Sequence, residues 1–327
     1  MLIVQKFGGS SLADIERLRR AAEICRQARS REHDVIVVVS AMGDTTDHLL
    51  DMAQMISPRP SKRELDALMT TGEQQSAALM AIMLESLGIK AQSLTGWQAG
   101  ILTEDEPGGC DIRLVAPARI QAALSRGCVP VVTGFQGFST GGDITTLGRG
   151  GSDTTAVALA AALEADSCRI YTDVDGIYTA DPRLVSSAVK LKSIDLRDML
   201  ALSRSGSQVL HSKSVELALA NNIDIQLMSA FQDGEGSLVC RMKDGERPIY
   251  AGVTRSVADS ELSLAGKGAD ASALSSMVIL LSQAGIPVTD GRLSYCCATV
   301  KVARAQLEEA MVLLHDKMLL GKYCPEE

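Results

Sequence analysis

Short apolar runs and longer amphipathic stretches alternate along residues 1–240. The apolar runs are rich in Val, Ile and Leu and predict buried strands at 2–7, 34–42, 88–94, 128–135, 168–174 and 224–230. Helical periodicity predicts helices at 14–29, 45–56, 62–87, 118–127, 152–165 and 205–222. This alternation predicts an α/β fold, a three-layer α/β/α sandwich with a mainly parallel sheet.

A smaller pattern follows a segment at 233–248 that is rich in glycine, charge and turn residues. Strands are predicted at 261–266, 286–291 and 295–303, and helices at 272–285 and 305–319. The βαββα order predicts a small α+β module, with no final strand evident in residues 321–327. We therefore expect two domains, a large one over 1–240 and a small one over 249–327.

Composition narrows the class of protein. Aromatic residues make up only 3 % of the chain, so the core must be built from aliphatic side chains and methionine. The net charge of −8 argues against nucleic acid as a partner. The chain has no apolar run long enough for a membrane span and no signal-peptide pattern at its start. Its eight cysteines form no CxxC pair. We expect a cytoplasmic protein without disulfides or a metal-binding cluster, in which Cys296 and Cys297 are packed strand residues.

The first candidate for chemistry is KFGGSS at 6–11, which follows a predicted strand and precedes a predicted helix. Glycines at such a turn let backbone N–H groups approach a phosphate, and Lys6 adds a full positive charge. The lysine precedes the glycines, so this is not a Walker A loop. The alternative is a tight turn beside an ordinary surface lysine.

A second glycine-rich segment, GRGGSD at 148–153, precedes a strongly apolar helix. Ser152 is well placed to cap that helix. Arg149 can bind a carboxylate or a phosphate through two hydrogen bonds. Asp153 either interacts with the helix dipole or serves as a partner for Mg²⁺ or a lysine. Two glycines around an arginine favour a functional role over a simple cap.

Two further segments carry candidate residues. At 171–183, Thr172 and Asp173 end a predicted strand, Tyr178 is suited to stack on a base, and Arg183 is suited to reach phosphates. The alternative is a capped surface loop. At 68–81, Glu73 is interpreted as opening a helix. There its negative charge would either interact favourably with the helix dipole or bind a substrate ammonium group.

Taken together and in this order, these motifs resemble the amino-acid kinase family and, within it, the aspartate kinases. The resemblance runs through KFGGSSLAD, VVSAMGDTTD, TGEQQSAAL, GFQG, GDITTLGRGGSDTTA, TDVDGIYTADPR and SAFQDGEGSLV, and so covers residues 1–240. Carbamate and acetylglutamate kinases share the fold but not this set of motifs. The resemblance implies an ATP-dependent phosphotransferase that acts on the β-carboxylate of L-aspartate to give 4-phospho-L-aspartate, the first step toward lysine, threonine and methionine.

The resemblance also implies a role for each matching residue. The residues expected to hold the transferring phosphate are Lys6, Gly8, Gly9 and Ser10. Those expected to form the aspartate site are Ser40, Thr46, Glu73, Phe135, Arg149 and Ser152. Those expected to bind ATP further along the chain are Thr172, Asp173, Tyr178, Arg183 and Gln208. Within these sets, Arg149 would hold the α-carboxylate, Glu73 the ammonium, and Asp153 would organise the catalytic lysine.

The implied chemistry requires ATP with Mg²⁺ and no general base, because the β-carboxylate is ionised at pH 7. The protein has to align two anions and offset their repulsion. Lys6, Arg149, helix N-termini and Mg²⁺ are cations or dipoles of the kind required.

Two departures from the family pattern stand out. At Gln208 the family usually has a lysine that contacts ATP phosphates, so we expect weakened ATP binding. The C-terminal region has room for about one ACT module instead of two, and GKGADASA at 266–273 replaces the usual Pro-Gly loop. We expect absent or altered feedback by lysine or threonine and a homodimer formed through this ACT-like module. The alternatives are a kinase of this family for another amino-acid carboxylate, and a catalytically impaired regulatory or structural subunit.

Overall fold

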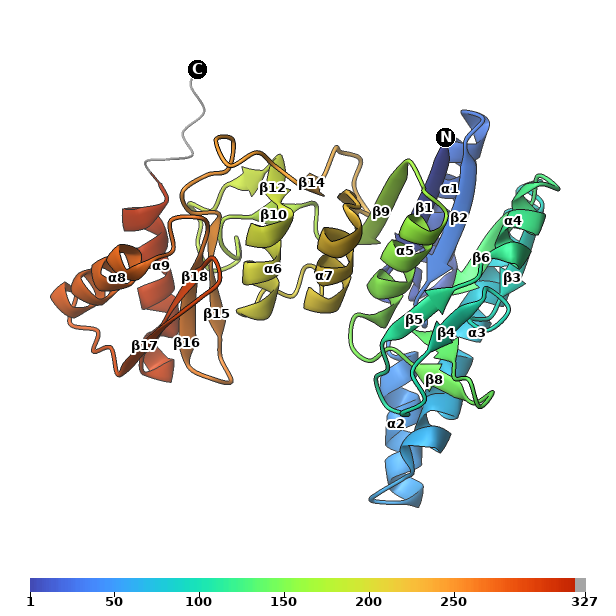
Figure 1. Ribbon diagram of the computed structural model, residues 1–327, viewed down its shortest axis with the longest axis horizontal. Helices are drawn as coiled ribbons and strands as arrows, with labels where there is room; N and C mark the ends of the chain where they lie inside the picture. The colour runs from blue at the N-terminus through green and yellow to red at the C-terminus, as the bar shows by residue number, and fades with distance from the viewer. Residues whose placement is uncertain (321–327) are drawn as a thin grey trace. The chain divides into compact units, whose positions relative to one another are not determined.

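The computed structural model describes residues 1–320, which form two compact units (Figure 1). The first unit contains Met1–Asp175 and Glu216–Glu235, and the second contains Gly176–Val215 and residues 236–320. Helix α7 (Ser212–Asn221) carries the point at which the chain returns to the first unit. The boundary predicted between a catalytic domain and an ACT-like module, at 240–249, stays a prediction. The two compact units are divided at other places along the chain.

The first unit is built on six neighbouring parallel strands in the order β13-β9-β1-β2-β6-β3. Their bounds are β1 (Leu2–Phe7), β2 (Asp34–Val39), β3 (Ala91–Leu94), β6 (Val129–Thr133), β9 (Ser167–Thr172) and β13 (Ile225–Ser229). All six correspond to predicted apolar runs. Strands β2 and β6 are buried at nearly every position because helices cover both faces of the sheet. The predicted α/β sandwich with a mainly parallel sheet is confirmed.

Helices cover both faces of this sheet (Figure 1). On one face, α1 (Ile15–Ser30) and α3 (Lys62–Ser86) pack on each other and on the strands, and α2 (Thr45–Ile56) packs against α3. Their apolar side chains join strand residues in one core, with Leu18, Met80 and Val37 fully or almost fully buried. Helix α5 (Gly151–Ala162) lies against β1 and β9, and its first ten residues are all buried. Helix α4 (Ala118–Leu124) packs beside β6.

A small second sheet in this unit was not predicted. Its order is β5-β4-β7-β8, with bounds β4 (Ile101–Thr103), β5 (Ile112–Val115), β7 (Gln136–Phe138) and β8 (Ile144–Thr146). Each strand has only three or four residues, which is too short for an alternating pattern to be read from sequence. This sheet is important for the site because β8 leads directly into GRGGSD.

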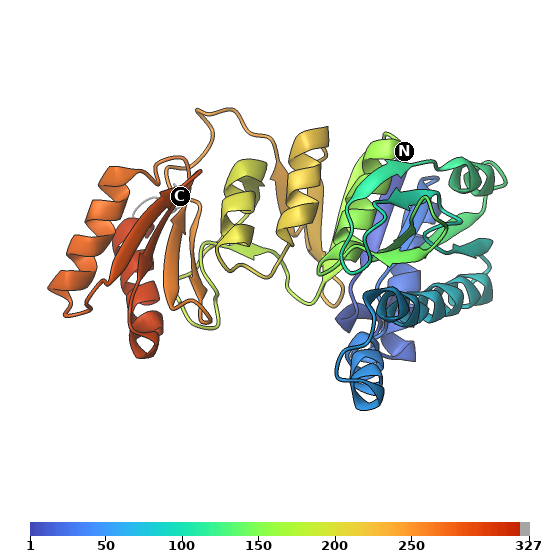
Figure 2. The same ribbon diagram turned by 60° about the horizontal axis from the view of Figure 1, so that its bottom comes forward.

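The second unit contains a four-stranded antiparallel sheet in the order β15-β16-β18-β17. Its bounds are β15 (Gly252–Ser256), β16 (Glu261–Ala265), β17 (Asp290–Ser294) and β18 (Cys297–Lys301). Helices α8 (Ala271–Gln283) and α9 (Leu307–Met318, after a 3-10 turn η2 at Arg304–Gln306) cover one face, and α6 (Leu196–Arg204) covers the other (Figure 2). The remaining strands are β10 (Ile177–Tyr178), β11 (Lys190–Leu191), β12 (Ser193–Asp195) and β14 (Ser237–Cys240). The core of buried Val, Leu and Met side chains fits the small α+β module that was expected.

Some boundaries differ from the predictions. The strand predicted at 286–291 is largely wrong, because β17 begins only at Asp290. The helix predicted from 205 begins at Ser212, since Gly206 adopts φ 122° and interrupts it. Helix α6 and strand β15 were not predicted. The final strand that we expected to be missing falls in residues 321–327, outside the described part of the chain.

Within residues 1–320, no helix combines the length and the apolar character needed to cross a membrane. None of the seven cysteines in the same range forms a disulfide with another of them.

Candidate active site

Lys6 lies at the carboxyl end of β1, the central strand of the parallel sheet, with its side chain 10 % exposed. A methyl group added at Gly8 would lie 3.6 Å from Lys6 Nζ, so the ammonium lies beside the glycine backbone. The following turn, η1 (Ser10–Leu12), packs closely on the segment after β2. A Cβ at Gly9 would lie 2.8 Å from the Ala41 carbonyl oxygen, so only glycine fits there. The Gly43 N–H donates to the Gly9 carbonyl (3.0 Å) and fixes the two loops together.

The second glycine-rich loop reaches helix α5 through two left-handed residues. Gly148 and Gly150 have φ of 75° and 74°, a region that L side chains rarely adopt. The helix begins at Gly151 with Gly150 as its N-cap, and no side chain caps it. The predicted cap at Ser152 is therefore wrong. Ser152 lies inside the first helical turn, close to Gly134, where an added Cβ would come within 2.6 Å of its hydroxyl.

An ion pair joins the two glycine-rich loops. Lys6 Nζ lies 2.6 Å from Asp153 Oδ1, and the Asp153 side chain is only 12 % exposed. Asp153 projects from the first turn of α5, where the helix dipole also favours its negative charge. Asp153 thus holds the ammonium of Lys6 beside the first loop, and its role in organising a catalytic lysine stays a prediction.

Glu73 is buried, 3 % exposed, in the middle of α3. The interpretation that it opens a helix is wrong, because α3 begins eleven residues earlier at Lys62. Glycine at 72 lets the helix approach the loop after β2, since an added Cβ there would lie 2.9 Å from the Ala41 side chain. Glu73 Oε1 accepts a hydrogen bond from the Ala41 N–H (3.0 Å).

The other carboxylate oxygen of Glu73, Oε2, is buried and has no hydrogen-bond partner among the residues that the structure describes. Burial raises the pKa of Glu73 from 4.5 to about 7, although the hydrogen bond from Ala41 opposes this shift. A buried acceptor without a donor is costly unless a ligand supplies one. A cationic donor such as an ammonium group would satisfy Oε2 and stabilise the ionised carboxylate.

These residues surround one cavity of about 290 Å³. Its lining comes from five segments, which are the end of β1 with the turn after it, the stretches that follow β2, β6 and β8, and Glu73 on α3. The lining residues are Lys6, Gly9, Ser40, Ala41, Gly43, Thr46, Glu73, Phe135, Gly148, Arg149, Gly150, Gly151, Ser152 and Asp153. Every residue predicted for the aspartate site is among them, and ligands in open α/β sheets bind at this edge. Ala41 and Gly43 were not singled out from sequence, whereas glycines 148, 150 and 151 belong to the predicted GRGGSD segment without having been given individual roles.

Two of these residues are exceptional in conformation or exposure. Phe135 has φ 68°, which is rare for a bulky residue. Its carbonyl accepts from the Leu147 N–H (2.8 Å) and its N–H donates to Thr155 Oγ1 (3.2 Å), so it is held from both sides. Arg149 is exposed at the rim, where its guanidinium is available to an anion.

The residues predicted to bind ATP are distributed between the units. Gly8 and Ser10 belong to the first loop. Thr172 is the last residue of β9, the strand paired with β1, and Asp173 follows it; the Thr172 hydroxyl donates to Asp173 Oδ1 (3.0 Å). Tyr178, Arg183 and Gln208 belong to the second unit. Arg183 forms an ion pair with Asp181 (2.8 Å), its side chain is 87 % exposed, and Gln208 is exposed between α6 and α7.

The chain belongs to the amino acid kinase family, whose model matches residues 1–229. Within that family it is similar to aspartokinases. It is 51 % identical to the aspartokinase of Mycobacterium tuberculosis strain H37Rv over 269 residues, 81 % of this chain and 64 % of that protein. It is 43 % identical to the aspartokinase of Bacillus sp. strain MGA3, covering 98 % of this chain and 80 % of that protein. The chain thus spans somewhat less than two thirds of the mycobacterial relative.

The fold is also that of a solved aspartokinase. The structure of E. coli aspartokinase III in complex with aspartate and ADP matches 97 % of this chain and 100 % of that chain, with a TM-score of 0.84 at 20 % identity. At this level of identity the match establishes the fold alone.

Proposed function

We propose that this protein is an aspartate kinase, which transfers the γ-phosphoryl group of ATP to the β-carboxylate of L-aspartate. One observation carries the proposal. A single cavity brings the Lys6–Asp153 ion pair together with the unpartnered Glu73 Oε2 and with Arg149 at the rim. The similarity to aspartokinases, one of them solved with aspartate and ADP, supports the same conclusion.

The cavity suits an α-amino acid with an acidic side chain. Glu73 accepts the α-ammonium group at its free carboxylate oxygen, and Arg149 holds the α-carboxylate with two hydrogen bonds. Together they fix the α-carbon, so the β-carboxylate extends toward Lys6. A glutamate side chain is one methylene longer, and its carboxylate would overshoot the in-line position. We therefore expect a preference for aspartate over glutamate.

The chemical step needs positioning and charge compensation. A β-carboxylate oxygen attacks the γ-phosphorus, the bond from that phosphorus to the β–γ bridging oxygen breaks, and ADP departs with the bonding electrons. The carboxylate has no proton to lose, so no general base is required. Two unit negative charges about 4 Å apart repel by about 4 kcal/mol at an effective dielectric constant of about 20. The Lys6 ammonium, held by Asp153, offsets this repulsion at the transferring phosphate.

ATP enters as its Mg²⁺ complex. The described residues contain no group of three or more His, Cys, Asp or Glu side chains arranged to hold a metal ion. Mg²⁺ is commonly bound through substrate phosphates, water and one or two carboxylates, and ATP supplies the phosphates. Thr172, Asp173, Tyr178, Arg183 and Gln208 are proposed to bind the nucleotide, with the role of each resting on the resemblance.

The first test is ADP release in a coupled assay with L-aspartate, with L-glutamate and with no acceptor. We expect ADP release that depends on aspartate and is much slower with glutamate. Equal rates with and without aspartate would contradict the proposal. A protein that binds aspartate without turnover would instead be a catalytically impaired subunit.

Three further features remain proposals that rest on the sequence. They are a homodimer formed through the ACT-like module, absent or altered feedback by lysine or threonine, and a cytoplasmic location. Sedimentation of the full chain tests the first, and titration of activity with each amino acid tests the second.

A further inference from the structure

Asp66 is a fully buried carboxylate on α3 that does not line the cavity and has no part in the mechanism above. It precedes Glu73 by seven residues, close to two helical turns, so both side chains lie on the same face of α3. A buried carboxylate is retained only where donors compensate its lost hydration. Its partners therefore indicate what it does.

Three donors converge on Asp66, and two of them belong to one residue. Asp66 Oδ1 accepts from the Thr146 hydroxyl (2.8 Å), and Oδ2 accepts from the Thr146 N–H (3.2 Å). Oδ2 also accepts from the Gly108 N–H (2.9 Å). The side chain thus fixes both the end of β8 and the loop 104–111 that joins β4 to β5.

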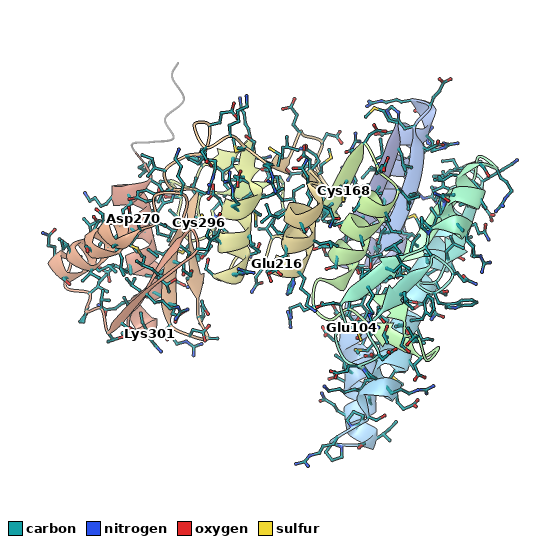
Figure 3. The ribbon with its side chains drawn as sticks, in the orientation of Figure 1. Glu104, Cys168, Glu216, Asp270, Cys296 and Lys301 are labelled. Atoms are coloured by element: carbon teal, nitrogen blue, oxygen red, sulfur yellow. The ribbon has the colours of Figure 1, made fainter. Side chains whose placement is uncertain are left out.

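Thr146 is the last residue of β8, and Arg149 follows three positions later. The loop 104–111 supports the same segment. The Cys110 N–H donates to the Thr146 carbonyl (2.8 Å), and a methyl group added at Gly148 would lie 3.4 Å from the Gly109 Cα. Helix α3 packs against β8 (Figure 1), and Figure 3 labels Glu104, the first residue of this loop. Asp66 therefore holds the base of the Arg149 loop and the loop packed against it.

We propose that Asp66 is a positioning residue that sets the distance between Arg149 and Glu73, and with it the affinity for the amino-acid substrate. The inference rests on the proposed function. One rigid helix carries Glu73, which receives the ammonium, and Asp66, which anchors the loop that receives the α-carboxylate. These two substrate groups are attached to the same carbon, so their binding partners must be held at a fixed separation.

Four variants separate positioning from a purely structural role. Asp66→Ala removes all three hydrogen bonds. Asp66→Asn can keep its oxygen on the two N–H groups and donate its amide hydrogen to the Thr146 hydroxyl, so it preserves the geometry without the charge. Thr146→Val removes one hydrogen bond and leaves the others. The control is Asp105→Ala, because Asp105 lies in the same loop and also accepts from the N–H and hydroxyl of a threonine, Thr140, but it is exposed and does not line the cavity.

The readouts are the Michaelis constants for aspartate and ATP, kcat, and hydrogen exchange of the backbone amides at 146–152. For Asp66→Ala we expect KM for aspartate to rise roughly tenfold or more, with KM for ATP changed less than about twofold. Exchange at 146–152 should accelerate. Thr146→Val should also raise KM for aspartate and accelerate exchange at 146–152, each by less than Asp66→Ala does. It replaces Asp66→Ala in the test if that variant does not fold. Asp66→Asn and Asp105→Ala should stay close to the wild-type values.

The inference is overturned if KM for aspartate is unchanged in Asp66→Ala, or if KM for ATP rises in that variant as much as KM for aspartate does. Slow exchange at 146–152 in both Asp66→Ala and Thr146→Val would also overturn it. A wild-type chain without aspartate-dependent ADP release would refute the proposed function instead. Hydrogen exchange would then still decide whether Asp66 anchors the Arg149 loop.

Discussion

The raised pKa of Glu73 makes aspartate binding depend on pH in a predictable way. Only the ionised carboxylate pairs with an ammonium group, and in the unliganded protein the pKa is about 7. About a tenth of the protein is therefore ionised at this position at pH 6, and about nine tenths at pH 8. Because the apparent affinity scales with the competent fraction, we expect KM for aspartate to fall roughly tenfold between pH 6 and pH 8.

The same residue should lower the stability of the unliganded protein at high pH. Between pH 4.5 and about 7 the folded state holds a proton on Glu73 that the unfolded state has lost, so stability falls as pH rises through this range. Raising the pKa from 4.5 to about 7 corresponds to about 3 kcal/mol, since one pKa unit is worth about 1.4 kcal/mol. Glu73→Gln removes the buried charge and keeps an acceptor for Ala41. We therefore expect Glu73→Gln to be more stable than the wild type at pH 8 and similar at pH 5.

The assays are KM for aspartate and for ATP at pH 6, 7 and 8, and thermal unfolding without ligand over the same range extended to pH 5. Glu73→Gln should bind aspartate at least roughly tenfold more weakly at pH 8, because a charged hydrogen bond is lost. Glu64→Gln, on an exposed position of the same helix, is the control and should follow the wild type. A wild-type KM for aspartate that stays constant with pH, or a Glu73→Gln unfolding profile parallel to that of the wild type, would refute the reasoning.

Three further substitutions test other contacts. Gly134→Ala would place a methyl group 2.6 Å from the Ser152 side chain. We expect it to lower the free energy of unfolding, measured by thermal unfolding, by about 1–3 kcal/mol. The control Gly234→Ala, whose added methyl group would have nothing within 4 Å, should be nearly neutral. Equal stabilities would contradict this. Lys6→Met removes the cation at the transferring phosphate, so kcat should fall by about 100-fold or more, and a retained kcat would exclude that role. Gln208→Lys supplies the charge usual in the family, and steady-state kinetics should give a several-fold lower KM for ATP, while an unchanged value would mean that the site does not need it.

The parallel sheet and its site were predictable for a physical reason. Strands covered on both faces, such as Val35–Val39 in β2, must be apolar throughout and are visible as continuous runs. Their carboxyl ends share one edge of the sheet, so motifs after β1, β2 and β6 were bound to meet. The residues predicted for the aspartate site accordingly surround one cavity.

Other features depend on contacts that sequence does not display. Strands β4, β5, β7 and β8 are too short to show a period. The cap predicted at Ser152 was wrong because the left-handed Gly150 starts the helix earlier. Asp66 resembles an ordinary polar helix residue, and only its burial and three donors reveal its role. The pKa of Glu73 likewise follows from burial that is established by the fold.

The central proposal is that the protein phosphorylates the β-carboxylate of an L-aspartate bound in this cavity. The most direct measurement is to trap the acyl phosphate with hydroxylamine during turnover with ATP and aspartate, and to identify the product by mass spectrometry. The proposal predicts β-aspartyl hydroxamate in amounts equal to the ADP formed with the wild type, and little or none with Lys6→Met. ADP formed without the hydroxamate, or equal hydroxamate from both proteins, would contradict it.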